Sequence, residues 1–135
     1  MDLERVGETT FVAPSAPEKG TRTFGGQLLA HTLRAAQFTI DSDRFVHSSH
    51  SYFLRPGDVE LETEMEVETI RDGKSFSARQ VVAYQAGKEL FRCILSFQVP
   101  EVGLEWSPPT RFDVPQPGDD LVSYYQFWES QSPDL

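Results

Sequence analysis

The stretch of this chain that most constrains its fold is FGGQLLAHTLRAAQFTI, from Phe24 to Ile40. Read as a helix that begins at Gln27, it carries apolar side chains around most of its circumference. The polar residues recur at helical spacing as one narrow stripe: Gln27, His31, Arg34 and Gln37. A surface helix is polar over its outer half, so this helix should be enclosed by the rest of the fold. The centre of its apolar face is expected to run through Leu29, Leu33, Ala36 and Ile40.

The start of this helix lacks a side-chain cap. Phe24, Gly25 and Gly26 lead into it, and none is the Ser, Thr, Asp or Asn that usually accepts the first backbone N–H groups. Glycines also let another molecule approach those groups closely. The stretch is therefore a candidate site for an anion or an oxyanion, although paired glycines before a helix more often form only a tight turn.

Residues 59–99 carry the clearest strand signal. From Val59 to Thr69, apolar or small residues alternate with glutamates, which is the period of a strand with one buried and one wet face. Asp72-Gly73 and Ala86-Gly87 each suit a two-residue hairpin turn. Together they predict a three-stranded antiparallel meander.

Two-residue turns also fix the register of such a meander, because the turn decides which residues face each other. The expected pairs are Glu66 with Arg79 on the outer face, and Val67 with Ala78, Val82 with Phe91 and Cys93 with Gln80. In this register Cys93 faces the core, where it is expected to be a small buried hydrophobe.

Other segments give shorter signals. Thr10 to Ala13 is expected to be an edge strand, and Phe45 to Leu54 a strand that ends in a turn at residues 55–58. After Val99, prolines crowd into the next 18 residues, which is typical of a linker. The final LVSYYQFWESQSPDL is too rich in aromatics for a disordered tail, so it should pack and begin a second unit.

Composition excludes several functions. The formal charge of −9 disfavours nucleic acid and anionic membrane surfaces as partners, because both require a basic patch. Nothing approaches the roughly 20 apolar residues of a membrane span, and the N-terminus does not read as a secretion leader. The single cysteine cannot form an internal disulfide. A reducing compartment, the cytoplasm, is the natural expectation.

The expected elements describe an α+β fold, in which an antiparallel sheet wraps around one long central helix as a single hotdog domain. Four motifs carry a closer resemblance: FGGQLLAHTLRAA, HSSHSYFLRPGD, RDGKSFSARQVVA and LFRCILSFQVPE. In this order and spacing, from Asp2 to Val102, they resemble the N-terminal half of the type II acyl-CoA thioesterases, which are tandem double-hotdog enzymes. The resemblance implies a hotdog domain over residues 1–102. Residues 103–135 are then a linker and the start of a second hotdog.

The resemblance further implies hydrolysis of fatty acyl-CoA to free fatty acid and CoA, within fatty acid metabolism and without a cofactor. In that family a helix carboxylate, a hydroxyl residue and a glutamine orient the attacking water, and the second hotdog carries them. The matching positions here are Gly26 or Gln27, Val46 and Gln98, of which only Gln98 agrees chemically. The isolated chain is therefore expected to be a weak or inactive hydrolase.

The implied partners are acyl-CoA and a second hotdog domain or an identical subunit, as in a homodimer. The implied location is the cytoplasm or, if the source is eukaryotic, the peroxisome. Two functional hypotheses remain open. The chain is either part of an acyl-CoA thioesterase, where it supplies a wall of the substrate tunnel, or a non-catalytic acyl or acyl-CoA binding or assembly domain.

Weak catalytic candidates are Gln27, His31, His50 and Gln98. His31 lies one helical turn after Gln27, but a lone histidine on an apolar helix is more often a hydrogen-bonded core residue. His47 and His50 are three apart in an expected strand, so they should point to opposite faces and share no metal. No Gly-x-Ser-x-Gly motif is present, which argues against a serine nucleophile.

The phosphates of CoA call for cationic groups. Arg55, Arg71, Lys74 and Arg79 are expected to cluster around the turns of the meander. Arg79 is expected to pair with Glu66 instead of binding substrate. The expected substrate-binding residues are Gly25, Gly26, Gln27, Arg55, Arg71 and Ser75.

Overall fold

The computed structural model describes residues 3–16, 20–109 and 121–131. The elements of these residues are β1 (Glu4–Arg5), β2 (Thr10–Ala13), α1 (Gly25–Gln37), β3 (Phe45–Phe53), β4 (Thr63–Asp72), β5 (Phe76–Gln85), β6 (Lys88–Gln98) and α2 (Tyr124–Gln131). The chain divides into two compact units, Met1–Val102 and Gly103–Leu135, each of which is described by itself. Within the described ranges, neither helix has the length and apolar character needed to cross a membrane.

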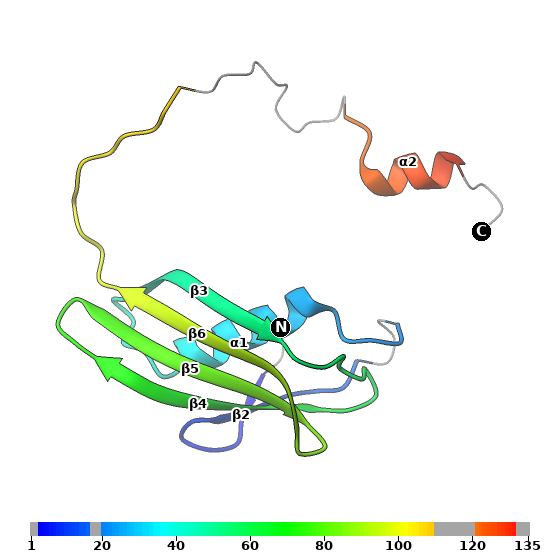
Figure 1. Cartoon of the computed structure of the whole chain (residues 1–135), viewed down its shortest axis with the longest axis horizontal. Coiled ribbons are helices and arrows are strands. Elements are labelled where there is room, and N and C mark those ends of the chain that lie inside the picture. The colour runs from blue at the N-terminus through cyan, green and yellow to red at the C-terminus, as the bar shows by residue number, and fades with distance from the viewer. Residues whose placement is uncertain (1–2, 17–19, 110–120, 132–135) are drawn as a thin grey trace. The chain divides into compact units, whose positions relative to one another are not determined.

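The first unit is one antiparallel sheet with α1 lying along one face (Figure 1). The strand order is β1-β2-β4-β5-β6-β3, so the meander expected over residues 59–99 is confirmed as β4-β5-β6. β2 is a strand as expected, but β1 pairs with its outer side, so its expected edge position was wrong. The long free edge of the sheet is β3.

Helix α1 begins at Gly25, before the expected Gln27, and ends at Gln37. Its buried residues are Leu28, His31, Thr32, Ala35 and Ala36. The buried face of the helix is therefore rotated about the helix axis relative to the expected one, since Leu29 is 39% exposed and Leu33 is only half-buried. The reason is that the sheet covers one side of α1 alone, so complete enclosure of the helix by this chain was a wrong expectation.

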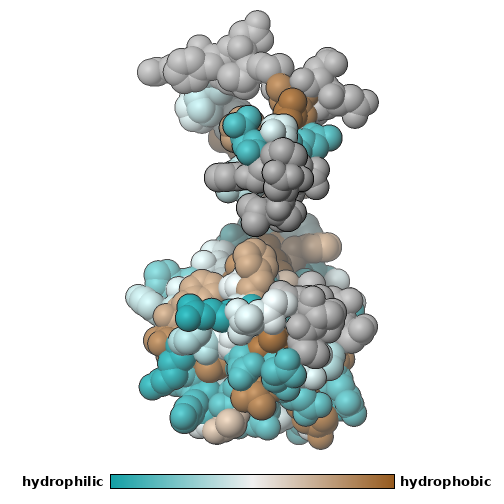
Figure 2. All heavy atoms as spheres, turned by 90° about the vertical axis from the view of Figure 1, so that its right-hand side faces the viewer, coloured by the Kyte–Doolittle hydropathy of each residue, from teal (hydrophilic) through white to brown (hydrophobic). Residues whose placement is uncertain are grey.

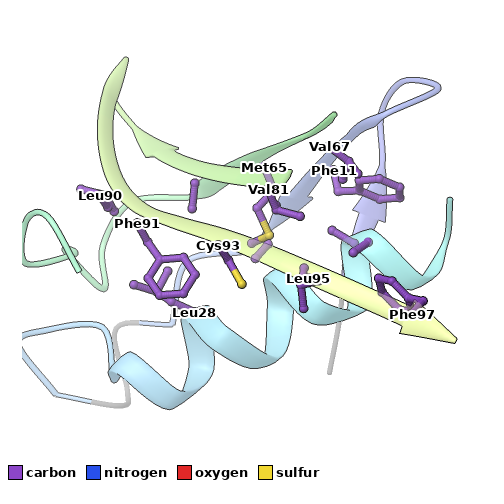
Figure 3. Close-up of a cluster of buried hydrophobic side chains, with 14 residues drawn as sticks. Phe11, Leu28, Met65, Val67, Val81, Leu90, Phe91, Cys93, Leu95 and Phe97 are labelled. Atoms are coloured by element: carbon purple, nitrogen blue, oxygen red, sulfur yellow. The ribbon is translucent and has the colours of Figure 1, made fainter. Parts of the chain in front are cut away.

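A single hydrophobic cluster fills the space between α1 and the sheet (Figure 3). Its largest fully buried members are Phe11, Phe91, Phe97, Met65, Leu95 and Val81. They come from β2, β4, β5 and β6, so every long strand except β3 contributes a large side chain to the centre. The small residues Ala35 and Ala36 let the helix backbone approach this cluster closely.

The register of the first hairpin differs from the expected one. Val67 pairs with Val81 and Thr69 with Arg79, whereas Val67 had been expected opposite Ala78. Two features shift the strands: the connection spans Gly73 to Ser75, and a bulge lies between Thr69 and Arg71. Because strand side chains alternate, an odd shift moves the whole of β5 to the opposite face.

The second hairpin turns at Ala86-Gly87 as expected, with positive φ angles of 47° and 71° that suit a two-residue hairpin turn. A bulge then shifts the pairing by one residue, so Phe91 lies opposite Ala83 and not opposite Val82. Cys93 faces the core as expected, but its partner is Val81.

Arg79 therefore lies on the helix side of the sheet, 3% exposed, and its expected pairing with Glu66 was wrong. Its guanidinium donates two bonds to the Asp72 carboxylate, at 2.9 and 3.1 Å. It also donates to the hydroxyl of Thr39 at 3.0 Å and to the Thr39 carbonyl at 2.9 Å. A buried guanidinium is tolerated only when its donors are satisfied, and here these bonds attach the end of α1 to the β4–β5 hairpin.

In the second unit, α2 begins with a reciprocal cap. The Gln126 N–H donates to the Ser123 hydroxyl at 3.2 Å, and the Ser123 N–H donates to the Gln126 side chain at 2.9 Å. Tyr124 and Phe127 are 71% and 52% exposed. The prolines at 115 and 117 and the side chains of Tyr125 and Trp128 lie outside the described residues. The expected packing of this segment thus stays a prediction.

The Asp72–Arg79 pair makes stability depend on pH. The hydrogen bond from Arg79 lowers the pKa of Asp72 below its ordinary value of 3.8. A carboxyl whose pKa is lower in the folded state than in the unfolded state stabilises the fold fully when the pH is above its unfolded-state pKa. This contribution is lost as the pH falls through the folded-state pKa. Asp72→Asn should therefore lower the free energy of unfolding by about 1 kcal/mol at neutral pH, since the Asp72 side chain is 54% exposed.

Urea unfolding between pH 2 and 7 measures this contribution. The curves of wild type and Asp72→Asn should converge at the acid end. Asp43→Asn is the matched control, because that carboxylate is 64% exposed and lies 3.8 Å from Arg44. Equal effects of the two substitutions on the free energy of unfolding at neutral pH would contradict the role given to the Asp72–Arg79 pair.

Candidate functional site

The N-terminus of α1 is uncapped in the structure. Phe24 occupies the N-cap position in an extended conformation and makes no side-chain capping bond, and the first turn holds no acidic residue. The Gln27 N–H is not available to a ligand, because it donates to the Phe24 carbonyl at 2.9 Å. Among the described residues, no backbone acceptor is recorded for the N–H groups of Gly25 and Gly26. These two are the donors available for a ligand.

Two aromatic rings explain why glycines stand here. A Cβ at Gly25 would lie 2.9 Å from Cε1 of Phe53, and a Cβ at Gly26 would lie 2.5 Å from Cε1 of Phe24. Phe24 is 76% exposed, whereas the Phe53 ring packs edge-on against Phe91 at 4.8 Å between centroids. A side chain at Gly25 would therefore meet a ring that packs against the core, whereas one at Gly26 would meet an exposed ring that can move. The sequence did not reveal either ring as a neighbour.

A cleft of about 310 Å³ opens beside this helix start. Its walls are Thr23, Gly25, Leu28, Phe53, Leu54, Arg55, Pro56 and Gly57. Most of this lining is apolar, so the cleft suits an aliphatic group, while Thr23 and Arg55 are its polar residues and Gly25 is the start of the uncapped helix. Of the expected substrate-binding residues, the structure brings Gly25, Gly26, Gln27 and Arg55 to this end of the sheet.

Arg55 has a structural role as well. Its side chain donates to the Glu89 carbonyl at 2.6 Å, and its backbone N–H donates to the Leu90 carbonyl at 3.2 Å. Leu54 donates to the same Leu90 carbonyl at 2.8 Å. These bonds hold the chain after β3 against the β5–β6 hairpin, which keeps the wall of the cleft in place.

Gln27 and His31 lie together, since both line a small hollow next to Val59 and Leu61. The hollow has a volume of only about 10 Å³, so it has no room for a substrate group. His31 is 5% exposed. Its burial on the sheet side of α1 agrees with the hydrogen-bonded core histidine that the sequence favours.

The remaining expected substrate-binding residues lie elsewhere. Arg71 and Ser75 belong to the β4–β5 hairpin, and Ser75 accepts the Val99 N–H at 3.0 Å. Gln98 pairs with Phe45, at the end of β3 opposite to Phe53. Eight residues of strand separate the two ends, about 25 Å. Arg55 and Arg71 therefore lie at opposite ends of the sheet, since the β4–β5 hairpin is at the Gln98 end, and Gln98 is not beside the helix start.

His47 and His50 share one face of the sheet, contrary to the expectation. A bulge between Val46 and Ser48 breaks the alternation of β3. The His47 ring meets the hydroxyl of Ser96 at 2.8 Å, and His50 pairs with Ile94. Ser96 and Ile94 alternate with the core residues of β6, so both histidines lie on the face away from α1.

Across the parts of the chain that the structure describes, no group of three or more His, Cys, Asp or Glu side chains is placed to hold an ion. The Cys93 thiol is buried and lies 3.3 and 3.2 Å from the hydroxyls of Ser49 and Ser51 on β3. A general base is not among these neighbours, so the thiol has no activating group.

A larger hollow of about 490 Å³ lies on the outer face, and it is acidic. Its lining includes Glu62, Glu64, Glu66 and Tyr84. The pKa of Tyr84 is raised, mainly by burial and also by the negative charge of Glu66. The negative charge of the hollow disfavours CoA phosphates. On the face shown in Figure 2, hydrophobic side chains lie interspersed among hydrophilic ones. The cleft at the helix start is therefore the better candidate site for an apolar ligand.

An antiparallel sheet packed on one helix is the architecture of a hotdog domain, and in this chain an uncapped helix start lies beside an apolar cleft. Residues 12–98 match the family model of the acyl-CoA thioesterase N-terminal domain, and the chain belongs to that family.

Similar proteins agree with this assignment. The chain is 40% identical over 105 residues to acyl-CoA thioesterase 2 of Haemophilus influenzae, covering 78% of this chain and 37% of that protein. It is 42% identical over 98 residues to human acyl-coenzyme A thioesterase 8, covering 73% and 31%. The solved acyl-CoA thioesterase II TesB2 of Mycobacterium marinum superposes with a TM-score of 0.74 at 36% identity, covering 87% and 44%. The chain thus spans about a third of the length of the curated relatives it matches.

Alanine substitutions distinguish the two glycines. Gly26→Ala should be neutral or stabilising by up to about 1 kcal/mol, because alanine favours the helix and the exposed Phe24 ring can move. Gly25→Ala should be less stable than Gly26→Ala, because Phe53 is held against Phe91. Urea unfolding measures both, and Gly25→Ala combined with Phe53→Ala should remove the clash. Identical stabilities for the two single variants would show that Phe53 is not fixed.

Proposed function

We propose that this chain is the N-terminal hotdog domain of an acyl-CoA thioesterase, an enzyme that hydrolyses fatty acyl-CoA to free fatty acid and CoA. The observation that carries the proposal is the family match over residues 12–98. The apolar cleft beside Gly25 supports it, since a thioester substrate joins an aliphatic chain to a polarised carbonyl. The domain then supplies one wall of the substrate tunnel.

Hydrolysis of a thioester needs a base that activates water and donors that stabilise the oxyanion. The N–H groups of Gly25 and Gly26 are suitable donors. The first turn of α1 carries no acid, and the carboxylate of Asp58, in the adjacent loop, accepts the Glu60 N–H at 3.0 Å. We therefore assign the activating carboxylate to a second hotdog domain, with residues 103–135 as the linker and the start of that domain.

The partner of this domain is a second hotdog, either in the same chain or in an identical subunit. β3 supports this assignment, because its nine residues form a free edge whose backbone groups can pair with another strand. We place the protein in lipid metabolism, in the cytoplasm or, for a eukaryotic source, in the peroxisome. The buried free thiol of Cys93 is compatible with a reducing compartment.

A second candidate function is binding of acyl-CoA or acyl groups without turnover. The observation in its favour is the absence of an acidic residue from the first turn of α1. Gly26 and Gln27, the positions that match the family's acid, cannot act as a base. An assay of hydrolysis distinguishes this function from the first.

Release of the CoA thiol from palmitoyl-CoA tests catalysis. The 135-residue chain should be about a hundredfold or more slower than the two-domain parent, because the first turn of α1 carries no carboxylate to activate water. Addition of the second domain should restore the rate, and Gln27→Ala should have a smaller effect than loss of the second domain's acid. Parent-like turnover by the isolated chain would place the catalyst within these residues.

Sedimentation measures the pairing of the edge. The isolated chain should sediment as a homodimer at micromolar concentration, and His50→Lys on β3 should weaken the dimer by setting like charges against each other. Ile94→Lys is the matched control, because Ile94 lies directly beside His50 on the same face but on an interior strand. Dissociation by Ile94→Lys alone would locate the interface on the sheet face, and a monomeric wild type would refute the dimer.

A further inference from the structure

Gln85 is a buried polar side chain that no part of the proposed chemistry uses. It is 5% exposed at the end of β5, immediately before the turn at Ala86-Gly87. Its amide N–H₂ donates to the carbonyls of Asp58 and Leu61, at 2.8 and 3.1 Å, and to the hydroxyl of Thr63 at 3.0 Å. Its amide oxygen accepts the Asp58 N–H at 2.8 Å. The side chain thus replaces backbone pairing for a segment without a strand partner.

The segment that Gln85 holds is the loop from Leu54 to Glu62, called here the cleft loop. Its Gly57 carbonyl accepts the N–H of Thr23, the second residue before α1, at 3.0 Å. Gly57 is buried, and a Cβ there would lie 2.8 Å from the Thr23 hydroxyl. The cleft loop therefore fits closely against the entry to the helix, and the placement of one decides the placement of the other.

The same loop forms a wall of the cleft at the helix start, through Leu54, Arg55, Pro56 and Gly57. Gln85 itself does not line the cleft. Gln85 belongs to the β5–β6 hairpin, whose tight turn holds its backbone in place. A movement of the cleft loop would widen or close the space between Pro56 and Gly25.

We propose that Gln85 is a positioning residue: it holds the cleft loop against the entry to α1 and so sets the shape of a cleft for the aliphatic chain of a fatty acyl thioester. The identity of the ligand rests on the proposed function, whereas the positioning of the loop does not. A primary amide matches this loop, because the loop presents one N–H donor, at Asp58, together with two carbonyl acceptors, at Asp58 and Leu61.

Hydrogen exchange tests the positioning directly. In Gln85→Leu, the amides of Asp58 and Thr23 should exchange about tenfold faster or more, since each loses or loosens a hydrogen bond. The exchange rate of the Val67 amide should change only with global stability. This amide donates to the carbonyl of Thr9, the residue before β2. Val81→Ala is the matched control, because Val81 is a fully buried residue of the same strand that makes no bond to the loop.

Gln85→Glu supplies a pH readout that a merely structural role would not give. The ionised side chain keeps an acceptor for the Asp58 N–H but sets a carboxylate against the carbonyls of Asp58 and Leu61. Its protonated form regains a donor. Protection of Asp58 and Thr23, relative to Val67, should therefore be higher at pH 5 than at pH 8 in Gln85→Glu, with no such change in Gln85→Leu.

Binding of hexadecyl-CoA thioether, which has no scissile thioester, tests the consequence for the cleft. Gln85→Leu should bind this probe about tenfold more weakly than Val81→Ala does. Unchanged exchange at Asp58 and Thr23 in Gln85→Leu would overturn the proposal, as would equal probe affinity in the two variants. A wild type that fails to bind the probe would refute the acyl ligand assigned to this cleft, whereas the palmitoyl-CoA assay decides the proposed hydrolysis. The exchange data would then still decide whether Gln85 positions the loop.

Discussion

Everything in the first unit depends on burial of one side of α1 against a twisted antiparallel sheet. Apolar burial is not directional, so it cannot by itself fix how far the helix slides or turns on the sheet. Two buried polar side chains supply that direction. Arg79 bonds to Thr39 beyond the C-terminus of the helix, and Gln85 holds the loop that meets Thr23 before its N-terminus. The apolar core provides the stability, and these two clamps provide the geometry.

Much of the fold was predictable because it follows from local patterns. The positions of α1 and β3, the meander and the turn at Ala86-Gly87 all follow from hydrophobic period and turn residues. The faces of β5 did not follow, because the β4–β5 connection is longer than two residues and a bulge lies between Thr69 and Arg71, and no periodicity reveals either feature. Arg79 strengthened the error, since a charged residue suggests the wet face of a strand when its buried partners are unknown.

The candidate site was predictable only in part, for a similar reason. Glycines before a helix are visible in the sequence, and so is the lack of a capping residue. The rings of Phe24 and Phe53 come to those glycines through tertiary packing, and Gln85 reaches the cleft loop across 24 to 27 positions of the chain. A polar residue directly before a hairpin turn was the available signal for Gln85, but its face depended on a register that the bulges had altered.

The two clamps also differ from ordinary side-chain pairs in the freedom they leave to the chain. Three of their bonds run from a side chain to backbone carbonyls, at Thr39, Asp58 and Leu61. Every amino acid carries that carbonyl. For these bonds the receiving positions place little demand on residue type, whereas the arginine and the glutamine have no equivalent substitute. Mutational tolerance in this domain should be asymmetric, with the information for placing the helix concentrated in two side chains of a single strand.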